Sequence, residues 1–215
     1  MNTFEQIRRS LRLSMNGIAA QALKNAYPEY HLVYGVDLVR IKEIAALYPH
    51  DTSLALSLWD TSCREEMLVA TSLFDITDKS DNANKLVNLL TETAFTDEIR
   101  LQLARNYLKH VTSSSNLNEW AISGNENQKL CALITATLLP VLALDTQTLN
   151  TLLDLVNLFS SDKKISTCRV LSNFFETLLR IDTAKWKPKI QQLSTTNPSN
   201  PLLLQEIKTI LYECQ

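Results

Sequence analysis

A cysteine beside an arginine is the first pair of residues in this sequence that could do chemistry. Cys63 precedes Arg64, and a neighbouring guanidinium can lower the pKa of a thiol and make it a nucleophile. Catalysis by a thiol also needs a base, and none of the three histidines (His31, His50 and His110) is placed to serve Cys63. The histidines are dispersed and lack the spacing of metal ligands. We therefore predict neither a catalytic thiol nor a metal site.

The other cysteines indicate a cellular compartment. All four lie far apart, mostly within apolar stripes, and no C-x-x-C pair occurs; they are Cys63, Cys131, Cys168 and Cys214. Scattered cysteines of this kind are typical of buried free thiols in a reducing compartment. We expect a cytoplasmic protein.

Glycine is scarce, with 3 residues in a chain of 215. Dinucleotide- and phosphate-binding loops need glycine for close backbone approach, and neither G-x-G-x-x-G nor G-x-x-x-x-G-K-[ST] occurs. We expect no nucleotide cofactor. A strand-rich fold also needs glycine in its tight turns, whereas long leucine-rich segments here repeat with the helical period. The sequence therefore predicts an all-α fold.

The basic residues allow two interpretations. A net charge of −2 does not indicate a nucleic-acid-binding domain, which is often strongly basic, but it does not exclude a local basic face. Residues that could line such a face are Arg8, Arg9, Arg12, Arg40, Lys42, Arg64, Arg100, Arg105 and Lys129. The chain has 21 basic residues, so a solvated surface explains these positions equally well.

The elements that must position these residues centre on the stretch Leu56–Asp75. It predicts two helices joined by a tight turn, with Trp59 at the corner. The second helix should begin at Thr61 or Ser62, where Ser62 and Glu65 have the spacing of a capping box. Apolar residues then recur at three- and four-residue intervals and form one stripe.

Similar patterns predict helices along the rest of the chain. We expect one helix over residues 2–25, a connector from Tyr27 to Gly35, and helices capped by Asp37, by Asp51 or Thr52, by Ser80 or Asp81, and by Thr96. A polar loop at Thr112–Asn116, a short helix to Trp120, a turn at Ser123–Asn125 and a helix over Gln128–Leu139 should follow. Next come a helix capped by Asp145 or Thr146, a turn at Ser160–Lys163, a helix from Ile165 to Arg180, a short piece around Trp186 and Pro188, a segment at Asn197–Pro201 and a final helix.

Aromatic residues recur at the corners between these helices. Trp59 and Trp120 are 61 residues apart, and Phe159 lies 39 residues beyond Trp120. A corner aromatic every one or two helix pairs, at a period of about 40 residues, is typical of HEAT-like α-solenoids. We predict one curved domain over residues 1–215, with an N-terminal helix and connector to residue 34, repeats over 35–193 and a capping helix over 194–215. The longest apolar run, Leu130–Leu144, is too short to span a bilayer, so we predict no membrane association.

Two sequence motifs support a family resemblance. One is Tyr34-Gly-Val-Asp-Leu-Val-Arg-Ile41, and the other is Leu58-Trp59-x-Thr61-x-x-Arg64-Glu65-x-x-Leu68-Val-Ala70. They resemble the DNA alkylation repair family of HEAT-like-repeat proteins, the AlkD-like glycosylases. Three later stretches keep the family's order of elements, namely Phe95–Ile99, Asn106–His110 and Glu119–Trp120.

The resemblance implies a right-handed solenoid with a basic concave face for duplex or branched DNA. Active members of the family release cationic 3- or 7-alkylpurines without a metal or nucleotide cofactor. A carboxylate near the sugar stabilises the positive charge that develops there. Aromatic faces near the base attract its positive charge.

The family's catalytic positions transfer one by one. The acid at the start of a helix falls, with a one-residue gap, on Asp97, our candidate catalytic residue. The family's tryptophan four residues before the acid is Thr93 here, its arginine is Lys129, and its second tryptophan falls near Thr177. Three of the four positions therefore differ. The candidate DNA-binding residues are Arg64, Arg100, Lys129, Trp59 and Trp120.

Each candidate also has a structural interpretation. Asp97 lies where the helix dipole favours an acid, Trp59 and Trp120 occupy corners where tryptophans commonly anchor the packing, and Arg64 can pair with neighbouring helices. Two hypotheses follow for the whole chain. The first is a DNA-binding protein of the repair family with degenerate catalytic positions, and the second is a non-enzymatic protein–protein interaction scaffold.

Overall fold

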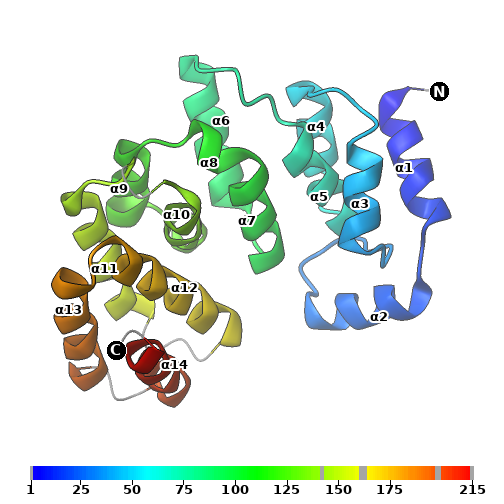
Figure 1. Cartoon of the computed structure of the whole chain (residues 1–215). Coiled ribbons are helices and arrows are strands. Elements are labelled where there is room, and N and C mark those ends of the chain that lie inside the picture. The colour runs from blue at the N-terminus through cyan, green and yellow to red at the C-terminus, as the bar shows by residue number, and fades with distance from the viewer. Residues whose placement is uncertain (1, 141–142, 160–163, 197–199, 214–215) are drawn as a thin grey trace. The chain divides into compact units, whose positions relative to one another are not determined.

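Every regular element in the described part of the chain is a helix (Figure 1). The structure is a computed structural model, and it describes residues 2–140, 143–159, 164–196 and 200–213. Within these ranges no β-strand occurs, although Leu32 and Cys63 form an isolated parallel bridge. The prediction of an all-α fold is confirmed. The turn predicted at 160–163, residues 197–199 and Cys214 lie outside the described residues.

The helices follow one another with short connections. In chain order they are α1 (Thr3–Leu13), α2 (Gly17–Ala26), α3 (Leu38–Ala45), α4 (Thr52–Trp59), α5 (Arg64–Leu73), α6 (Asp81–Thr93), α7 (Asp97–Leu103), the π-helical turn η1 (Ala104–Leu108), α8 (Lys109–Val111), α9 (Ser114–Ser123), α10 (Glu126–Leu138), α11 (Thr146–Phe159), α12 (Ile165–Ile181), α13 (Thr183–Thr196) and α14 (Pro201–Glu213). The helices α7, η1 and α8 continue one another without a connecting segment.

The chain divides into two compact units. The first comprises Met1–Leu86 and Ala94–Val111, and the second comprises Val87–Thr93 and Thr112–Gln215. One boundary lies within α6, between Leu86 and Val87, and another lies directly after it, between Thr93 and Ala94. The first half of this helix therefore belongs to one unit and its second half to the other.

Polar side chains begin several helices as the sequence predicts. Asp37, Asp51 and Thr96 each accept a hydrogen bond from a backbone N–H of the first helical turn. Such caps satisfy donors that have no partner within the helix. Asn125 also caps its helix and forms a capping box with Gln128, so α10 starts two residues earlier than predicted.

The single helix predicted over residues 2–25 is wrong. α1 ends at Leu13, and Asn16 starts α2 by accepting the N–H of Ala19. Asn16 is also bound to the later connector, because its N–H donates to the carbonyl of Tyr34 at 3.1 Å. Gly35 is required at this crossing: its φ is +76°, and a Cβ there would lie 2.3 Å from the carbonyl oxygen of Asn16.

Two other predicted boundaries differ from the structure. Part of the polar loop predicted at Thr112–Asn116 is helical, because Ser113 and Asn116 form a capping box that starts α9. The short piece around Pro188 is instead part of the 14-residue helix α13. Proline removes the hydrogen bond to the carbonyl of Ala184; both residues are exposed, so water can solvate that carbonyl.

The first unit is built around α5. Nine of its ten residues are buried, and it packs against α3, α4 and α7. The ring of Phe74, which follows α5, lies between Trp59 and Tyr107, with centroid distances of 6.2 and 5.3 Å. The helix predicted to organise the chain is therefore the centre of this unit.

The second unit has two layers of helices. Helix α10 packs on α12, and α12 packs on α14; on the other side, α9 packs on α11 (Figure 1). Side-chain hydrogen bonds join α11 to α13. We call α9, α11 and α13 the outer layer of this unit, and α10, α12 and α14 its inner layer. None of the described helices is long and apolar enough to cross a membrane.

Candidate nucleic-acid interface

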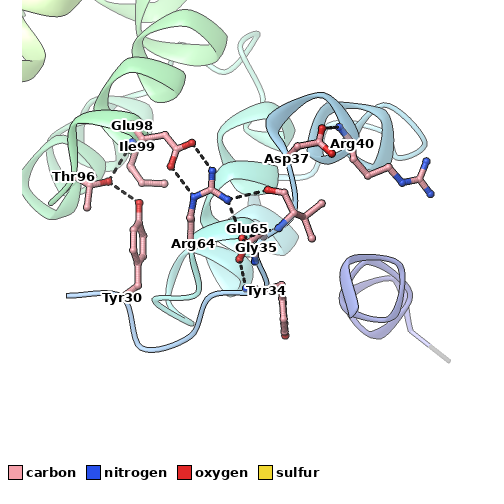
Figure 2. A network of polar contacts seen from close by, with 11 residues as sticks. Tyr30, Tyr34, Gly35, Asp37, Arg40, Arg64, Glu65, Thr96, Glu98 and Ile99 are labelled. Carbon is pink, nitrogen blue, oxygen red and sulfur yellow. Dashed lines mark hydrogen bonds and ion pairs between the residues drawn. The ribbon is translucent and has the colours of Figure 1, made fainter. Parts of the chain in front are cut away.

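The two motifs that support the family resemblance meet in one buried polar network (Figure 2). Glu65, at the start of α5, is fully buried. Its carboxylate accepts the backbone N–H groups of Tyr34 and Gly35 at 2.9 Å and of Val36 at 3.3 Å. The bend at Gly35 aims these three donors at one carboxylate, and they stabilise its charge in place of water.

The capping box predicted between Ser62 and Glu65 is wrong. Helix α5 begins at Arg64 after Cys63, whose side chain makes no capping bond. Ser62 instead adopts a φ of 51° in the turn, and the hydroxyl of Thr61 accepts the N–H of Cys63 at 3.2 Å. The carboxylate of Glu65 instead accepts the backbone N–H groups of the connector.

Arg64 holds the two halves of the network together. Its guanidinium donates to the carbonyl of Val36 at 3.0 Å and to Glu65 at 2.8 Å. It also makes a bidentate pair with Glu98 of α7 at 2.6 and 2.7 Å. Burial alone would lower the pKa of Arg64, but the pairs with Glu98 and Glu65 more than offset it and raise the pKa. With 6% of its side chain exposed, Arg64 has the structural role that the sequence left open.

A second buried carboxylate lies next to the first. Glu66 is fully buried, and Arg8 of α1 makes a bidentate pair with it at 2.9 and 3.1 Å. The hydroxyl of Tyr34 donates to the same carboxylate at 3.0 Å. The hydrogen bond with Glu66 raises the pKa of Arg8, and burial raises the pKa of Tyr34 to about 12.

The start of α7 is fixed to the connector by a pair of hydroxyls. The side chain of Thr96 accepts the N–H of Ile99 at 3.3 Å and forms a 2.6 Å hydrogen bond with the hydroxyl of Tyr30. Burial raises the pKa of Tyr30, so this hydroxyl keeps its proton. Thr96 and Glu98, which flank Asp97 in the sequence, thus tie the first turn of α7 to the connector and to α5.

The candidate catalytic residue Asp97 is paired with another candidate, Arg100. Its carboxylate accepts from the guanidinium at 2.6 Å, and the same guanidinium donates to the carbonyl of Ala94 at 2.9 Å. The side chain of Asp97 is 28% exposed, whereas that of Arg100 is 7% exposed. The pair closes the turn before α7, and Arg100 offers little surface to a ligand.

The two candidate tryptophans pack inside the protein. Trp59 is 4% exposed and lies edge-on to Phe74, and Trp120 is 1% exposed. The indole N–H of Trp120 donates to the side-chain carbonyl of Asn88 at 2.9 Å. This placement favours the interpretation of both rings as packing anchors, because neither face is open to a base.

Lys129 lies half-buried on α10 in the second unit. It lines a hollow of about 390 Å³ together with Glu126, Phe159 and Lys164. Of the five predicted DNA-binding residues, it keeps the most accessible side chain. Asp97 belongs to the other unit.

The two threonines that the resemblance aligns with the family's tryptophans have internal partners. Thr93 is exposed and donates to the carbonyl of Leu89 at 2.7 Å. Thr177 is buried and donates to the carbonyl of Asn173 at 2.9 Å. The phenylalanines that precede Thr177, at positions 174 and 175, are fully buried. At these positions the structure presents no exposed aromatic face.

The thiol of Cys63 is not activated by the neighbouring arginine. Burial raises the pKa of Cys63 to about 12, and the guanidinium of Arg64 is directed to carboxylates and a carbonyl instead of to the thiol. Within the described residues, no group of three histidine, cysteine or acidic side chains could hold a metal ion. The three described cysteines are buried.

The sequence did not indicate which side chains pair with Arg64 and Glu66 in this network. Glu98 holds Arg64, and Arg8 holds Glu66. One signal was available: two adjacent glutamates are followed directly by the apolar run Met67–Ala70, and acids on a buried helix need cations and N–H donors nearby.

Comparisons with known proteins identify the fold and the family. A solved structure described as "a new family of proteins related to the HEAT-like repeat DNA glycosylases with affinity for branched DNA structures" superposes with a TM-score of 0.72 at 15% sequence identity. The superposition covers 98% of this chain and 94% of the other, and it shows that the fold is of the HEAT-like repeat type. No curated protein sequence matches the chain. The sequence profile described as "DNA alkylation repair enzyme" matches residues 7–165, and the chain therefore belongs to this family.

Proposed function

We propose that this protein binds duplex or branched DNA and has weak glycosylase activity or none. Membership of the repair family supports DNA as the ligand. The solved structure with the same fold belongs to a protein with affinity for branched DNA, which supports junctions as one class of substrate. The buried thiols support a reducing compartment such as the cytoplasm.

The ion pair between Asp97 and Arg100 is the observation that argues most against efficient excision. A glycosylase of this kind needs an anionic carboxylate near the sugar. Here a guanidinium lies 2.6 Å from that carboxylate and offsets its charge before any substrate arrives. Thr93 also replaces the aromatic ring that would attract the cationic base.

DNA contacts should come from exposed basic side chains rather than from the buried arginines. Arg64 and Arg100 are enclosed by protein partners. Lys129 is half-buried, and Arg105 on the π-helical turn is exposed. Lysines and arginines that contact phosphates release counterions, so the affinity should fall steeply with salt.

The test is fluorescence anisotropy with plain duplex, duplex containing 7-methylguanine and a three-way junction, each at two salt concentrations. We expect salt-sensitive binding to all three, and base release from the methylated duplex close to the uncatalysed rate. Lys129→Gln should weaken binding, and Lys129→Arg should restore it. Absence of binding at low salt would overturn the proposal. Rapid base release that Asp97→Asn abolishes would show an active glycosylase instead.

A protein–protein interaction scaffold is the second candidate function. The net charge of −2 and the burial of four of the five predicted DNA contacts favour it. It predicts that none of the three DNA ligands binds at low salt. The same anisotropy experiment therefore separates the two functions.

A further inference from the structure

A polar groove separates two neighbouring helices of the outer layer in the second unit. It has a volume of about 410 Å³ and lies between α11 and α13. Amide side chains line it on both sides, with Asn150 and Asn157 from α11 and Gln192 from α13. Lys189 stands at one end, and Asp154 lies further along α11. Leu153 and Leu193 complete the lining, so the groove offers mainly hydrogen-bonding groups together with two apolar side chains.

Two lysines of α13 are held side by side at one end of this groove. The ammonium of Lys185 donates to the hydroxyl of Thr146 at 2.9 Å, and that of Lys189 donates to the side-chain carbonyl of Asn150 at 2.6 Å. Both lysines are exposed. Their four-residue spacing places them on the same face of the helix.

The ring of Trp186 fixes the position of both ammonium groups. Trp186 is fully buried, and the nitrogen atoms of Lys185 and Lys189 lie 5.1 and 4.9 Å from its ring centroid. A π-face attracts cations at this range. The tryptophan therefore holds two like charges near each other on the surface, at the junction between α11 and α13.

The charge of this lysine pair is not neutralised by a carboxylate. In the described ranges, neither ammonium has an acidic oxygen within ion-pair distance; the hydrogen-bond partners above are a neutral hydroxyl and a neutral amide. The nearest acid in sequence, Asp182, accepts the backbone N–H of Lys185 as part of the helix cap. Two adjacent cations with neutral partners repel each other, and an anion placed between them relieves that repulsion.

We propose that Lys185 and Lys189 bind a phosphate of the DNA backbone, and that the groove beside them holds the adjoining stretch of the strand. This inference rests on the proposed function and extends it. The lysine pair lies on the outer layer, whereas Lys129 lies on the inner layer of the same unit. It also lies beyond residue 165, where the match to the repair family ends.

Contacts on both layers favour a DNA ligand with arms that leave in more than one direction. A straight duplex has a single axis, whereas a junction has arms that leave in different directions and can place one on each layer. Two contacts joined through one ligand strengthen each other through effective concentration. The lysine pair should therefore contribute more to junction binding than to duplex binding.

The experiment compares the full-length wild type with the variants K185Q/K189Q and K185R/K189R. Affinities for a plain duplex and a three-way junction are measured by anisotropy over a series of salt concentrations. Each lost phosphate contact lowers the slope of log affinity against log salt by about 0.9. Because the pair binds one phosphate, K185Q/K189Q should reduce the magnitude of the junction slope by about 0.9, and K185R/K189R should keep the wild-type slope.

The outcomes separate this inference from the proposed function. If wild type binds DNA and K185Q/K189Q has the wild-type slope on the junction, the lysine pair has no role and the inference is overturned. If both double variants lose binding equally, the loss comes from the packing of α13 and not from charge, which also overturns it. If wild type binds neither ligand, the proposed function itself fails and this extension fails with it.

Discussion

Two adjacent carboxylates, Glu65 and Glu66, are both fully buried at the start of α5. A buried charge is costly unless cations and N–H donors surround it. Each glutamate has its own arginine, and Glu65 also has three backbone donors from the connector. These contacts join α1, α5, α7 and the connector at the residues that mark the family resemblance. The residues of this motif therefore stabilise the fold of the first unit.

Replacing Glu65 by glutamine should destabilise the protein by about 3 kcal/mol. The amide leaves Arg64 with one anion fewer and turns an N–H donor toward a site that already holds three donors. The measurement is the free energy of unfolding in urea. Glu43→Gln is the matched control, because its pair with Arg40 is exposed and should contribute about 0.5 kcal/mol. Equal effects of the two variants would contradict a buried, charge-dependent role.

At this scale the sequence identified the right residues and missed their partners. Arg64 and Glu65 were singled out, but Glu65 was paired with Ser62 because capping boxes are recognised by local spacing. Its actual partners lie around Gly35, a contact that depends on the tertiary fold. The burial of Arg64 was open for the same reason: nothing near it in the sequence shows that Glu98 approaches from another helix.

The start of helix α7 shows what the sequence can predict about an element. Thr96 was expected to cap the helix and does so, because the cap depends on the residues immediately after it. The bond from Thr96 to Tyr30 and the π-helical turn that continues α7 were not expected, since both depend on packing. The break before Asn16 was also not expected, since it involves a tertiary contact with Tyr34. The helix α13 continues through Pro188 for another reason, because water can solvate the carbonyl that the proline leaves without a donor.

Thr96→Ala should lower the free energy of unfolding by about 2–3 kcal/mol. The change removes the helix cap and leaves the buried hydroxyl of Tyr30 without its 2.6 Å partner. Urea unfolding of Thr96→Ala and Thr96→Ser measures this, and serine should retain most of the stability. In a Tyr30→Phe background, Thr96→Ala should cost only the cap, about 1 kcal/mol. A full loss in that background would show that the two hydroxyls are not coupled.

At the scale of the whole molecule, the buried tyrosines of the described residues all lie in the first unit, together with Cys63. Burial raises the pKa of Cys63 from 9.0 to about 12, and those of Tyr34 and Tyr107 from 10.0 to about 12. All three belong to the first unit. The sequence predicted helical repeats from the aromatic residues at the corners between helices. The uneven placement of the buried tyrosines is an asymmetry that follows from packing in the folded chain, and it could not be predicted from the order of residues.

The asymmetry predicts that alkali destabilises the first unit before the second. Below about pH 8 these groups are protonated in both the folded and the unfolded chain, so their burial has no pH-dependent cost. As the pH rises toward 12, the unfolded chain loses the protons first and is favoured. The free energy of unfolding of the first unit should therefore fall between pH 9 and pH 12.

Three buried cysteines report this locally, because Cys63 lies in the first unit and Cys131 and Cys168 lie in the second. A brief pulse of a thiol reagent after equilibration in urea labels only cysteines that unfolding has exposed, and peptide mass mapping assigns each label. Between pH 8 and pH 10.5, the urea midpoint at Cys63 should fall more than those at the other two. A common shift at all three would mean that the units unfold together, because a repeat protein whose neighbours are strongly coupled behaves as one cooperative unit.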